Sequence, residues 1–383
     1  MVLIPGKPHY TLPGKETHLI PKHSSNSPPS ANGHSCRIAA TATAVPPFTI
    51  TREDVKTYLG RTFNINERRV EAMMSVVDNA QVQKRHCIFP IDYTIEPRPL
   101  SKTNEEYQEH AIALARRAAE ECLAKAGVTP AEVDLIISVS CTGFMIPSLD
   151  AHLLNLMGFR NNVRRLPITE LGCVAGAMAL SRAWDFLRGS PDATVLVVAV
   201  ELPSLTFQRK DVSQANLISA IIFGDGAAAA IVTNRPASGP KILDVESFTL
   251  PGSMDALGFD LRDSGFHIVL SKEVPQLLRE KIKGLVENFL GRHNLTPQEM
   301  TAYLLHPGGQ KLLTSVEEEL GLSRCHTEFS WDVLRDYGNI SSATIFFILQ
   351  EWLTKRRMNP GDYGLMAGFG PGFSSELLLL QWT

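Results

Sequence analysis

The first half of the chain alternates apolar runs with helical patterns. Continuous apolar runs predict buried strands, and Gly127 marks the end of a long helical pattern that opens with a Thr103–Glu106 capping box. The predicted elements are a strand at 37–43, a helix at 103–127, a strand at 133–140, a helix at 173–188, a strand at 194–200 and an apolar stretch at 223–232. Strands that alternate with helices predict an α/β fold with a parallel sheet covered on both faces.

The second half repeats this plan after a linker at 235–240. Its predicted elements are helices at 274–290, 310–320 and 341–357 and strands at 301–305, 363–367 and 376–382. Each half ends with a turn of Phe and Gly that leads into an apolar strand, which suggests an internal duplication. We therefore predict two halves, residues 36–238 and 239–383.

Residues 1–35 differ from the rest of the chain in composition. The segment is rich in Pro, Ser, His and Lys, and such a composition buries too little apolar surface to offset the cost of ordering. We predict a flexible N-terminal extension. An arm that wraps a partner subunit is the alternative.

Composition and charge narrow the function. The 383 residues are 44% hydrophobic and 20% charged, with a net charge of -3, so nothing in the overall charge favours nucleic acid. The six cysteines form no CxxC pair, which argues against a zinc site or a disulfide framework and fits a reducing cytoplasm. No apolar run is long enough to span a membrane. We predict a cytoplasmic protein without a membrane span.

One cysteine lies where a nucleophile is expected. Cys173 follows Gly172 and opens a helix whose first residues are almost all small. The free N–H groups and the dipole of a first helical turn favour negative charge, so a thiol there should ionise more easily than a free thiol. The alternative is a buried structural cysteine.

Two other residues complete a possible nucleophilic site. His306 ends a predicted strand and precedes Pro-Gly-Gly, a loop where backbone can approach a ligand, and Asn339 precedes the helix at 341–357. Cysteine, histidine and asparagine form a known type of nucleophilic centre. A lone histidine is also common in cores and on surfaces, and Asn339 is equally suited to cap a helix. Asp225, which lies between two glycines, is interpreted as a turn residue rather than a metal ligand.

Four motifs in one order give the chain a family resemblance. They are Leu171-Gly172-Cys173, His306-Pro307-Gly308-Gly309, Gly338-Asn339-Ile340-Ser341-Ser342 and Gly368-Phe369-Gly370-Pro371-Gly372. Together they resemble the type III polyketide synthases, the chalcone synthase-like family, from about residue 36 to residue 383. The resemblance implies a thiolase fold of two related α/β halves in an αβαβα arrangement. It also implies a homodimer that uses coenzyme A thioesters and needs no metal or bound cofactor.

The resemblance assigns roles to the candidate residues. Cys173 would carry the acyl starter, and His306 would hold it as a thiolate with a lowered pKa. His306 and Asn339 would donate hydrogen bonds to the oxyanion formed when malonyl-CoA loses carbon dioxide. Phe223 and Phe266 match the two gatekeepers of the family, and the loop Gly370, Pro371 and Gly372 lies near its site.

The predicted cavity is less polar than a flavonoid-type pocket. In the resemblance its positions are Cys141, Ile146, Pro203, Thr206, Gly258 and Ser341. Cys141 and Pro203 replace threonines, and Ile146 replaces a methionine that reaches into the neighbouring subunit. This favours an aliphatic starter and a microbial alkylpyrone or alkylresorcinol synthase. Cys141 is interpreted as a small wall residue, with a second nucleophile as the alternative.

Several points stay open. The basic residues that hold the phosphates of coenzyme A cannot be chosen among Lys56, Arg61, Arg68, Arg69, Lys84 and Arg85. An aromatic starter, as in a chalcone or stilbene synthase, is an alternative for the substrate. A ketoacyl-ACP synthase III-like enzyme would share the Cys-His-Asn set, and a silent thiolase-fold scaffold is the alternative outside enzymes.

Overall fold

The computed structural model describes residues 35–63, 67–355 and 358–383. Of the predicted N-terminal extension, residues 1–34 therefore lie outside the described residues. The strands are β1 (Arg37–Ala44), β2 (Phe48–Thr51), β3 (Lys84–Cys87), β4 (Leu135–Val139), β5 (Arg164–Ile168), β6 (Thr194–Glu201), β7 (Gly226–Thr233), β8 (Lys241–Thr249), β9 (Leu257–Arg262), β10 (Gly265–Leu270), β11 (Met300–Leu305), β12 (Tyr363–Gly370) and β13 (Ser374–Gln381).

The helices follow the same chain order. They are α1 (Arg52–Thr62), α2 (Glu67–Asn79), α3 (Ile91–Thr94), α4 (Leu100–Ala126), α5 (Leu149–Met157), α6 (Ala175–Gly189), α7 (Gln214–Ile222), α8 (Val274–Gly291), α9 (Gln310–Leu320), α10 (Glu328–Tyr337) and α11 (Thr344–Lys355). Three short 3₁₀ segments lie between these elements: η2 (Gly172–Val174), η3 (Pro203–Thr206) and η6 (Ser341–Ala343).

Nine strands form one mixed sheet in the order β11-β12-β13-β8-β1-β7-β6-β4-β5. Outward from β8, the pairs β8–β13 and β13–β12 are antiparallel and β12–β11 is parallel. Outward from β1, the pairs β1–β7 and β7–β6 are antiparallel and β6–β4 is parallel. The repeated order confirms two related halves, which meet at the pair Arg37–Lys241.

The expectation of a parallel sheet is wrong in one respect. β13 and β7 run antiparallel to both of their neighbours, so each half is mixed. In the second half the cause is the short connection between β12 and β13, because a tight turn can join only antiparallel strands.

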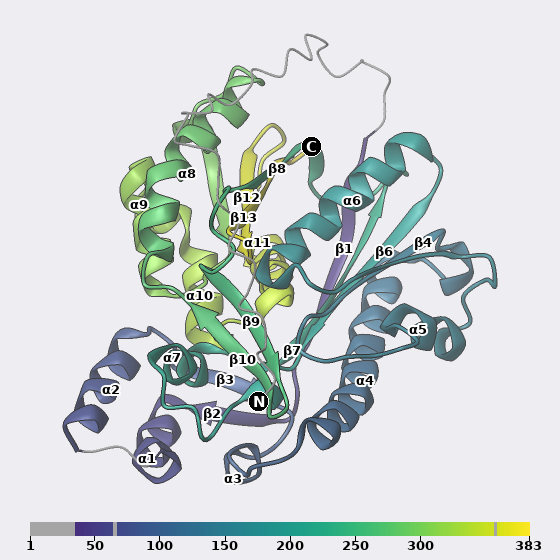
Figure 1. The fold of residues 1–383 in the computed structure, drawn as a ribbon. Coiled ribbons are helices and arrows are strands. Elements are labelled where there is room, and N and C mark those ends of the chain that lie inside the picture. Colours follow the sequence, from purple (N-terminus) through teal and green to yellow (C-terminus); the bar gives the residue numbers. More distant parts are fainter. Residues whose placement is uncertain (1–34, 64–66, 356–357) are drawn as a thin grey trace. The chain divides into compact units, whose positions relative to one another are not determined.

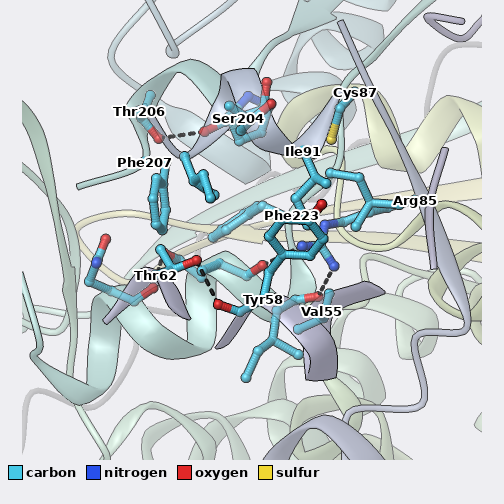
Figure 2. Close-up of a pocket in the computed structure, with 18 of the residues that line it drawn as sticks. Val55, Tyr58, Thr62, Arg85, Cys87, Ile91, Ser204, Thr206, Phe207 and Phe223 are labelled. Carbon is cyan, nitrogen blue, oxygen red and sulfur yellow. Dashed lines mark hydrogen bonds between the residues drawn. The ribbon is translucent and has the colours of Figure 1, made fainter. Parts of the chain in front are cut away.

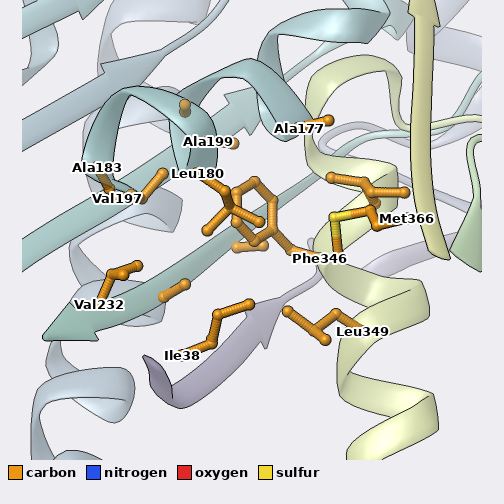
Figure 3. Close-up of a cluster of buried hydrophobic side chains, with 14 of the residues drawn as sticks. Ile38, Ala177, Leu180, Ala183, Val197, Ala199, Val232, Phe346, Leu349 and Met366 are labelled. Carbon is orange, nitrogen blue, oxygen red and sulfur yellow. The ribbon is translucent and has the colours of Figure 1, made fainter. Parts of the chain in front are cut away.

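Alternation of side chains along the strands builds five layers. On β6, Val195, Val197 and Ala199 pack with α6 and α11, whereas Leu196 and Val198 pack with α4. In the second half, one face of the strands packs on the same two helices and the other on α8 and α9. Figure 3 shows the middle layer, where Leu180 of α6 and Phe346 of α11 lie between strands of both halves. The structure therefore has the predicted αβαβα arrangement.

The long helix α4 begins earlier than its predicted capping box. Pro99 precedes its first residue, Leu100, and the hydroxyl of Thr103 donates to the Leu100 carbonyl inside the helix. Proline at the entrance of a helix needs no N–H partner, so the start at Leu100 is as natural as one at Thr103. Gly127 ends the helix in the left-handed conformation, as predicted.

Between the large elements, the structure adds small ones that the sequence patterns did not predict. α1, α2, the strand pair β2–β3, α7 and the hairpin β9–β10 gather on one side of the sheet in Figure 1. The patterns also missed the helices α5 and α10 and two strands of the large sheet, β5 and β8. The predicted helix at 341–357 begins as η6 and continues as α11, and residues 356–357 lie outside the described part. The linker predicted at 235–240 lies between β7 and β8.

Candidate active site

The turn that carries Cys173 is held by direct backbone packing. Gly172 adopts φ +55°, and a side chain there would lie 2.7 Å from the ring of Pro371. A Cβ on Gly370 would lie 2.7 Å from the backbone nitrogen of Val174. Only glycine allows this approach. The structure thus places the predicted loop Gly370, Pro371 and Gly372 against the turn η2.

Ser341 lies between two thiols. The Sγ of Cys173 donates to the Oγ of Ser341 at 3.4 Å, and the Sγ of Cys141 lies 3.5 Å from the same oxygen. Cys141 follows β4, Cys173 precedes α6 and Ser341 begins η6, so three distant segments meet here. Both cysteines keep a small accessible surface although protein surrounds them on most sides.

A buried carboxylate that the sequence reasoning missed lies behind these thiols. Glu201 is fully buried at the end of β6, and its oxygens accept hydrogen bonds from the backbone N–H of Cys141 at 3.1 Å and from the hydroxyl of Thr142 at 2.9 Å. Ser342 donates to it as well. Burial raises the pKa of this carboxyl, and the hydrogen bonds oppose the rise. A glutamate that ends an otherwise apolar strand was the signal that could have revealed it.

His306 is buried one residue beyond β11. The backbone N–H of His306 donates to the carbonyl of Ala367 in β12 at 2.9 Å. Gly368, which follows Ala367, packs against Val174 and Ala177. The strand β12 therefore links His306 to the Cys173 turn. Neither ring nitrogen of His306 has a hydrogen-bond partner among the described residues. Two unsatisfied nitrogens on a buried ring are unusual in folded proteins, and a functional role is one explanation for them.

Asn339 is also buried, and its side chain interacts with Cys173. Its Oδ1 accepts the N–H of Ser341 at 2.8 Å, which fixes the amide. The alternative role of helix cap is not realised for α11, because η6 separates Asn339 from that helix. The structure thus brings Asn339, Ser341 and Cys173 together.

The expected low pKa of the nucleophile is wrong for this arrangement. Burial raises the pKa of Cys173 to about 12, and the hydrogen bonds with Ser341 and Asn339 offset this only in part. Burial also lowers the pKa of His306 to about 3. Because no hydrogen bond joins the two side chains in the described structure, desolvation outweighs the helix dipole and both groups are neutral near pH 7.

A cavity of about 80 Å³ lies beside Phe223 (Figure 2). Phe223, Pro203 and Thr206 line it, whereas the other predicted cavity and gatekeeper residues, Cys141, Ile146, Gly258, Ser341 and Phe266, are not in its wall. Cys173, His306 and Asn339 do not line it either. Phe223 also connects the cavity to the polar centre, because its backbone forms a bridge with Asn339. The other apolar side chains in the wall include Ile50, Val55, Leu59, Phe63, Ile91, Ile95, Phe207, Ile221, Phe259 and Ile268.

The hairpin β9–β10 presents different residues to the cavity than the sequence predicted. Phe259 and Ile268 face each other in register and both line the cavity. Gly258 pairs with Val269, one residue along, and therefore lies on the opposite face. Phe266 is on the same face as Ile268 but stacks on Phe144, with ring centroids 5.3 Å apart. Reading the hairpin register from the sequence would have identified Phe259 and Ile268.

Ile146 does not enter the cavity of its own chain. Its side chain is 97% exposed and precedes a cis peptide bond to Pro147. Phe144, two residues earlier, is exposed as well, so this loop presents two apolar side chains at the surface.

The basic candidates for coenzyme A binding separate into groups. Arg85 is buried in the cavity wall and donates to the carbonyls of Ala220 and Ile221, and Lys56 pairs with Asp78 at 2.6 Å. Arg69 donates to the Val212 carbonyl, whereas Arg68 and Lys84 are exposed. The side chain of Arg61 lies outside the described part of the structure.

Within the described ranges, no group of three or more His, Cys, Asp and Glu side chains could hold a metal ion. None of the helices described here is long and apolar enough to cross a membrane.

Comparison with known proteins places these features in context. Residues 23–236 match the family model "Chalcone and stilbene synthases, N-terminal domain", and residues 243–382 match the model of the C-terminal domain. A 1,3,6,8-tetrahydroxynaphthalene synthase from Streptomyces peucetius is 36% identical over 351 residues, 90% of this chain and 93% of the relative. A phloroglucinol synthase from Pseudomonas fluorescens is 33% identical, over 88% of this chain and 97% of the relative. The crystal structure of 1,3,6,8-tetrahydroxynaphthalene synthase from Streptomyces coelicolor, a bacterial type III polyketide synthase, superposes with a TM-score of 0.88 at 32% identity and covers 91% of this chain and 99% of that one.

Proposed function

Because the chain belongs to the chalcone and stilbene synthase family and is a type III polyketide synthase, we propose that it extends an aliphatic acyl starter with malonyl-CoA. The chain is then a malonyl-CoA-dependent acyltransferase. Family membership sets aside the ketoacyl-ACP synthase and scaffold interpretations. The proposed products are alkylpyrones or alkylresorcinols.

The observation that carries the aliphatic starter is the wall of the cavity beside Phe223. Most of the side chains that line it are aliphatic or aromatic, and α1 with its C-cap residue contributes Val55, Leu59 and Phe63 as a group. Transfer of a methylene from water into such surroundings contributes about 0.8 kcal/mol. An acyl chain therefore gains binding energy with each carbon that fits.

We propose that Cys173 carries the starter. Its sulfur attacks the acyl-CoA carbonyl while His306 takes the thiol proton, and the coenzyme A thiolate leaves and recovers that proton. The two unsatisfied nitrogens of His306 suit this exchange. Because burial disfavours a charge on either group alone, the thiol proton would pass to His306 only as the thiolate and the imidazolium form together as an ion pair.

Malonyl-CoA is then decarboxylated at the same centre. The bond to the carboxylate breaks, carbon dioxide leaves and its electron pair forms an enolate on the remaining thioester. An N–H of His306 and the amide of Asn339 would donate to the enolate oxygen, and one such donor typically supplies about 3 kcal/mol. The enolate carbon attacks the acyl group on Cys173, the carbon–sulfur bond breaks, and the Cys173 thiolate that leaves takes up one proton from solvent, which is the proton that decarboxylative condensation consumes overall.

Cys141 fits the role of a wall residue better than that of a second nucleophile. Burial and the charge of Glu201 raise the pKa of its thiol, and its Sγ lies 3.5 Å from Oε1 of that carboxylate. A thiol held against a carboxylate forms a thiolate with difficulty.

The remaining expectations are part of the same proposal. Coenzyme A thioesters are the substrates and no bound cofactor takes part. Exposed basic residues such as Arg68 and Lys84 would contact the phosphates of coenzyme A. We place the enzyme in the cytoplasm, because the thiol of Cys173 has to stay reduced.

We further propose that two subunits associate through the surface that carries Ile146. β5 is an edge strand of the large sheet, and Arg164 to Pro167 are exposed along it. An unpaired edge and an exposed isoleucine both suit a partner of the same sequence. Sedimentation of the wild type and of Ile146→Asp tests this, with a concentration-dependent shift to monomer expected only in the variant.

The cavity assignment is tested with a matched pair of variants at Ser219. This residue lines the cavity from α7, and its hydroxyl bonds only to a carbonyl within the helix. Ser219→Leu fills the cavity, whereas Ser219→Ala removes only the hydroxyl. With butanoyl-CoA and octanoyl-CoA as starters, we expect Ser219→Leu to lower the octanoyl to butanoyl ratio of kcat/KM about tenfold. An equal octanoyl to butanoyl ratio of kcat/KM in both variants would contradict the aliphatic assignment. So would products that are built only from malonyl-CoA whichever starter is supplied.

A further inference from the structure

Asp225 joins three segments that surround the starter cavity. Its carboxylate is 1% exposed and lies immediately after Phe223 and Gly224. One oxygen, Oδ1, accepts the backbone N–H of Ser204 at 2.9 Å, and the other, Oδ2, accepts the backbone N–H of Ile88 at 3.0 Å. The hydroxyl of Ser204 also donates to Oδ2, at 2.5 Å. The sequence reasoning identified Asp225 only as a turn residue, and the proposed mechanism does not use it.

Each of these segments supplies a wall of the cavity. Ser204 belongs to η3, which contributes Pro203 and Thr206, and Ile88 follows β3, which contributes Arg85 and Cys87. Asp225 itself follows the gatekeeper Phe223. The backbone N–H of Asp225 donates to the His86 carbonyl at 2.8 Å, which adds a second link to β3.

Arg85 secures the same region from the other side of Phe223. Its guanidinium donates to the carbonyls of Ala220 at 2.5 Å and Ile221 at 2.8 Å, the last turn of α7. Its positive charge also stabilises the charged form of Asp225. In Figure 2 Arg85 lies beside Phe223, at the edge of the cavity. Phe223 therefore lies between two buried charged side chains, Asp225 and Arg85, which form hydrogen bonds with the backbone of the surrounding segments.

From this geometry we propose that Asp225 is a positioning residue that sets the width of the starter cavity and thereby the starters that the enzyme accepts. The inference rests on the proposed function of that cavity as the starter site. Asp225 touches no reacting atom. It acts through Ser204, whose backbone fixes η3 relative to Phe223.

The chemistry of the carboxylate makes the proposal testable. Its two oxygens accept backbone N–H groups from two different segments, so both must be acceptors. An amide has one oxygen, and Asp225→Asn leaves either Ser204 or Ile88 without an acceptor whichever way it turns. The free segment should then move away, and the cavity should lose its fixed width.

Two activities of the same enzyme separate positioning from general damage. The ratio of kcat/KM for octanoyl-CoA and butanoyl-CoA reports the cavity, whereas decarboxylation of malonyl-CoA without any starter reports the centre at Cys173, His306 and Asn339. Loss of one hydrogen bond corresponds to about a fivefold change in the starter ratio, and that is the change expected for Asp225→Asn. Decarboxylation should stay within about twofold of the wild type.

Two further variants complete the test. Asp244→Asn removes a comparable carboxylate from β8, where it bonds to His293 at 2.9 Å, and should change neither activity. Ser204→Ala removes the hydroxyl but keeps both backbone bonds to Asp225, so it should change the starter ratio in the same direction by a smaller factor. This variant keeps the test decisive if Asp225→Asn does not fold.

The outcomes distinguish this inference from the proposed function. If Ser219→Leu alters the starter ratio and neither Asp225→Asn nor Ser204→Ala does, the cavity assignment stands and Asp225 is not a positioning residue. An equal fall of decarboxylation and condensation in Asp225→Asn would also overturn the inference, because it indicates general damage. If no variant, Ser219→Leu included, alters the ratio, the cavity is not the starter site.

Discussion

Phe223 and Asn339 are joined by a parallel backbone bridge. The N–H of Asn339 donates to the Ile222 carbonyl at 2.8 Å, and the N–H of Gly224 donates to the Asn339 carbonyl at 3.1 Å. Phe223, which lines the proposed starter cavity, and Asn339, which is proposed to bind the enolate oxygen, are thus fixed relative to each other by backbone hydrogen bonds. Because the bridge uses backbone groups, the side chain of either residue can be changed without breaking it.

Removal of the ring of Phe223 should therefore change the cavity but not the position of Asn339. In Phe223→Ala, we expect kcat/KM for bulky aromatic starters to rise about tenfold, because the wall is wider. Malonyl-CoA decarboxylation should fall about tenfold, because an apolar wall disfavours the carboxylate relative to neutral carbon dioxide. Steady-state kinetics of Phe223→Ala and Phe223→Leu test this. Both rates of the leucine variant should lie between those of the alanine variant and the wild type. Unchanged decarboxylation in the alanine variant would contradict the role of the ring.

The reactivity of Cys173 should depend on His306. Burial raises the pKa of the thiol to about 12 despite its hydrogen bonds with Ser341 and Asn339, so a proton acceptor is needed near pH 7. In His306→Gln, we expect alkylation of Cys173 by iodoacetamide at pH 7 to slow by at least about tenfold, since glutamine cannot take the proton. Peptide mass spectrometry measures the rate at each cysteine, and the exposed Cys325 is an internal control. Equal rates in the two proteins would show that His306 does not activate the thiol.

Gly370 should tolerate no side chain. A Cβ there would lie 2.7 Å from the nitrogen of Val174 and 2.9 Å from the carbonyl oxygen of Leu171, and both are backbone atoms that cannot turn aside. We expect Gly370→Ala to displace the Cys173 turn, to lower kcat by about a hundredfold and to cost about 2 kcal/mol of unfolding free energy. Gly321→Ala, at the end of α9, is the control with free space around it. That variant pays only the backbone strain, so its kcat should match the wild type.

Asp225 should also give stability a pH dependence of known sign. Burial raises its pKa from 3.8 to about 6. The folded protein therefore binds more protons than the unfolded chain between these values, and stability is lost as the pH rises through about 6. Relative to Asp225→Asn, the wild type should lose on the order of 3 kcal/mol between pH 3.5 and pH 7.5. Denaturant unfolding of both proteins at each pH measures their free energies of unfolding. A wild type that gains stability relative to Asp225→Asn as the pH rises would contradict the burial of this carboxylate.

The sequence predicted many of the large elements, because their signals are local, but it missed β8, whose residues are mostly half-buried and form no continuous apolar run. The apolar run at 194–200 became β6, and the helix at 310–320 became α9 with the same bounds. The residues Cys173, His306 and Asn339 were identified by motif, and the structure brings Cys173 and Asn339 together at Ser341.

What the sequence could not predict depends on contacts between distant segments. Glu201 became part of the centre because β6 ends beside Cys141. The pKa of Cys173 was expected to fall from its place at a helix start. Its rise follows from burial by other segments, which no local pattern encodes.

The most direct test of the account is the site of the acyl group. The enzyme is mixed with octanoyl-CoA without malonyl-CoA, quenched in acid, digested and analysed by mass spectrometry, alongside Cys173→Ala and Cys141→Ala. We expect one octanoyl group on the Cys173 peptide of the wild type and of Cys141→Ala, and none on Cys173→Ala. An octanoyl group on Cys141, or an acylated Cys173→Ala protein, would contradict the claim that Cys173 carries the starter.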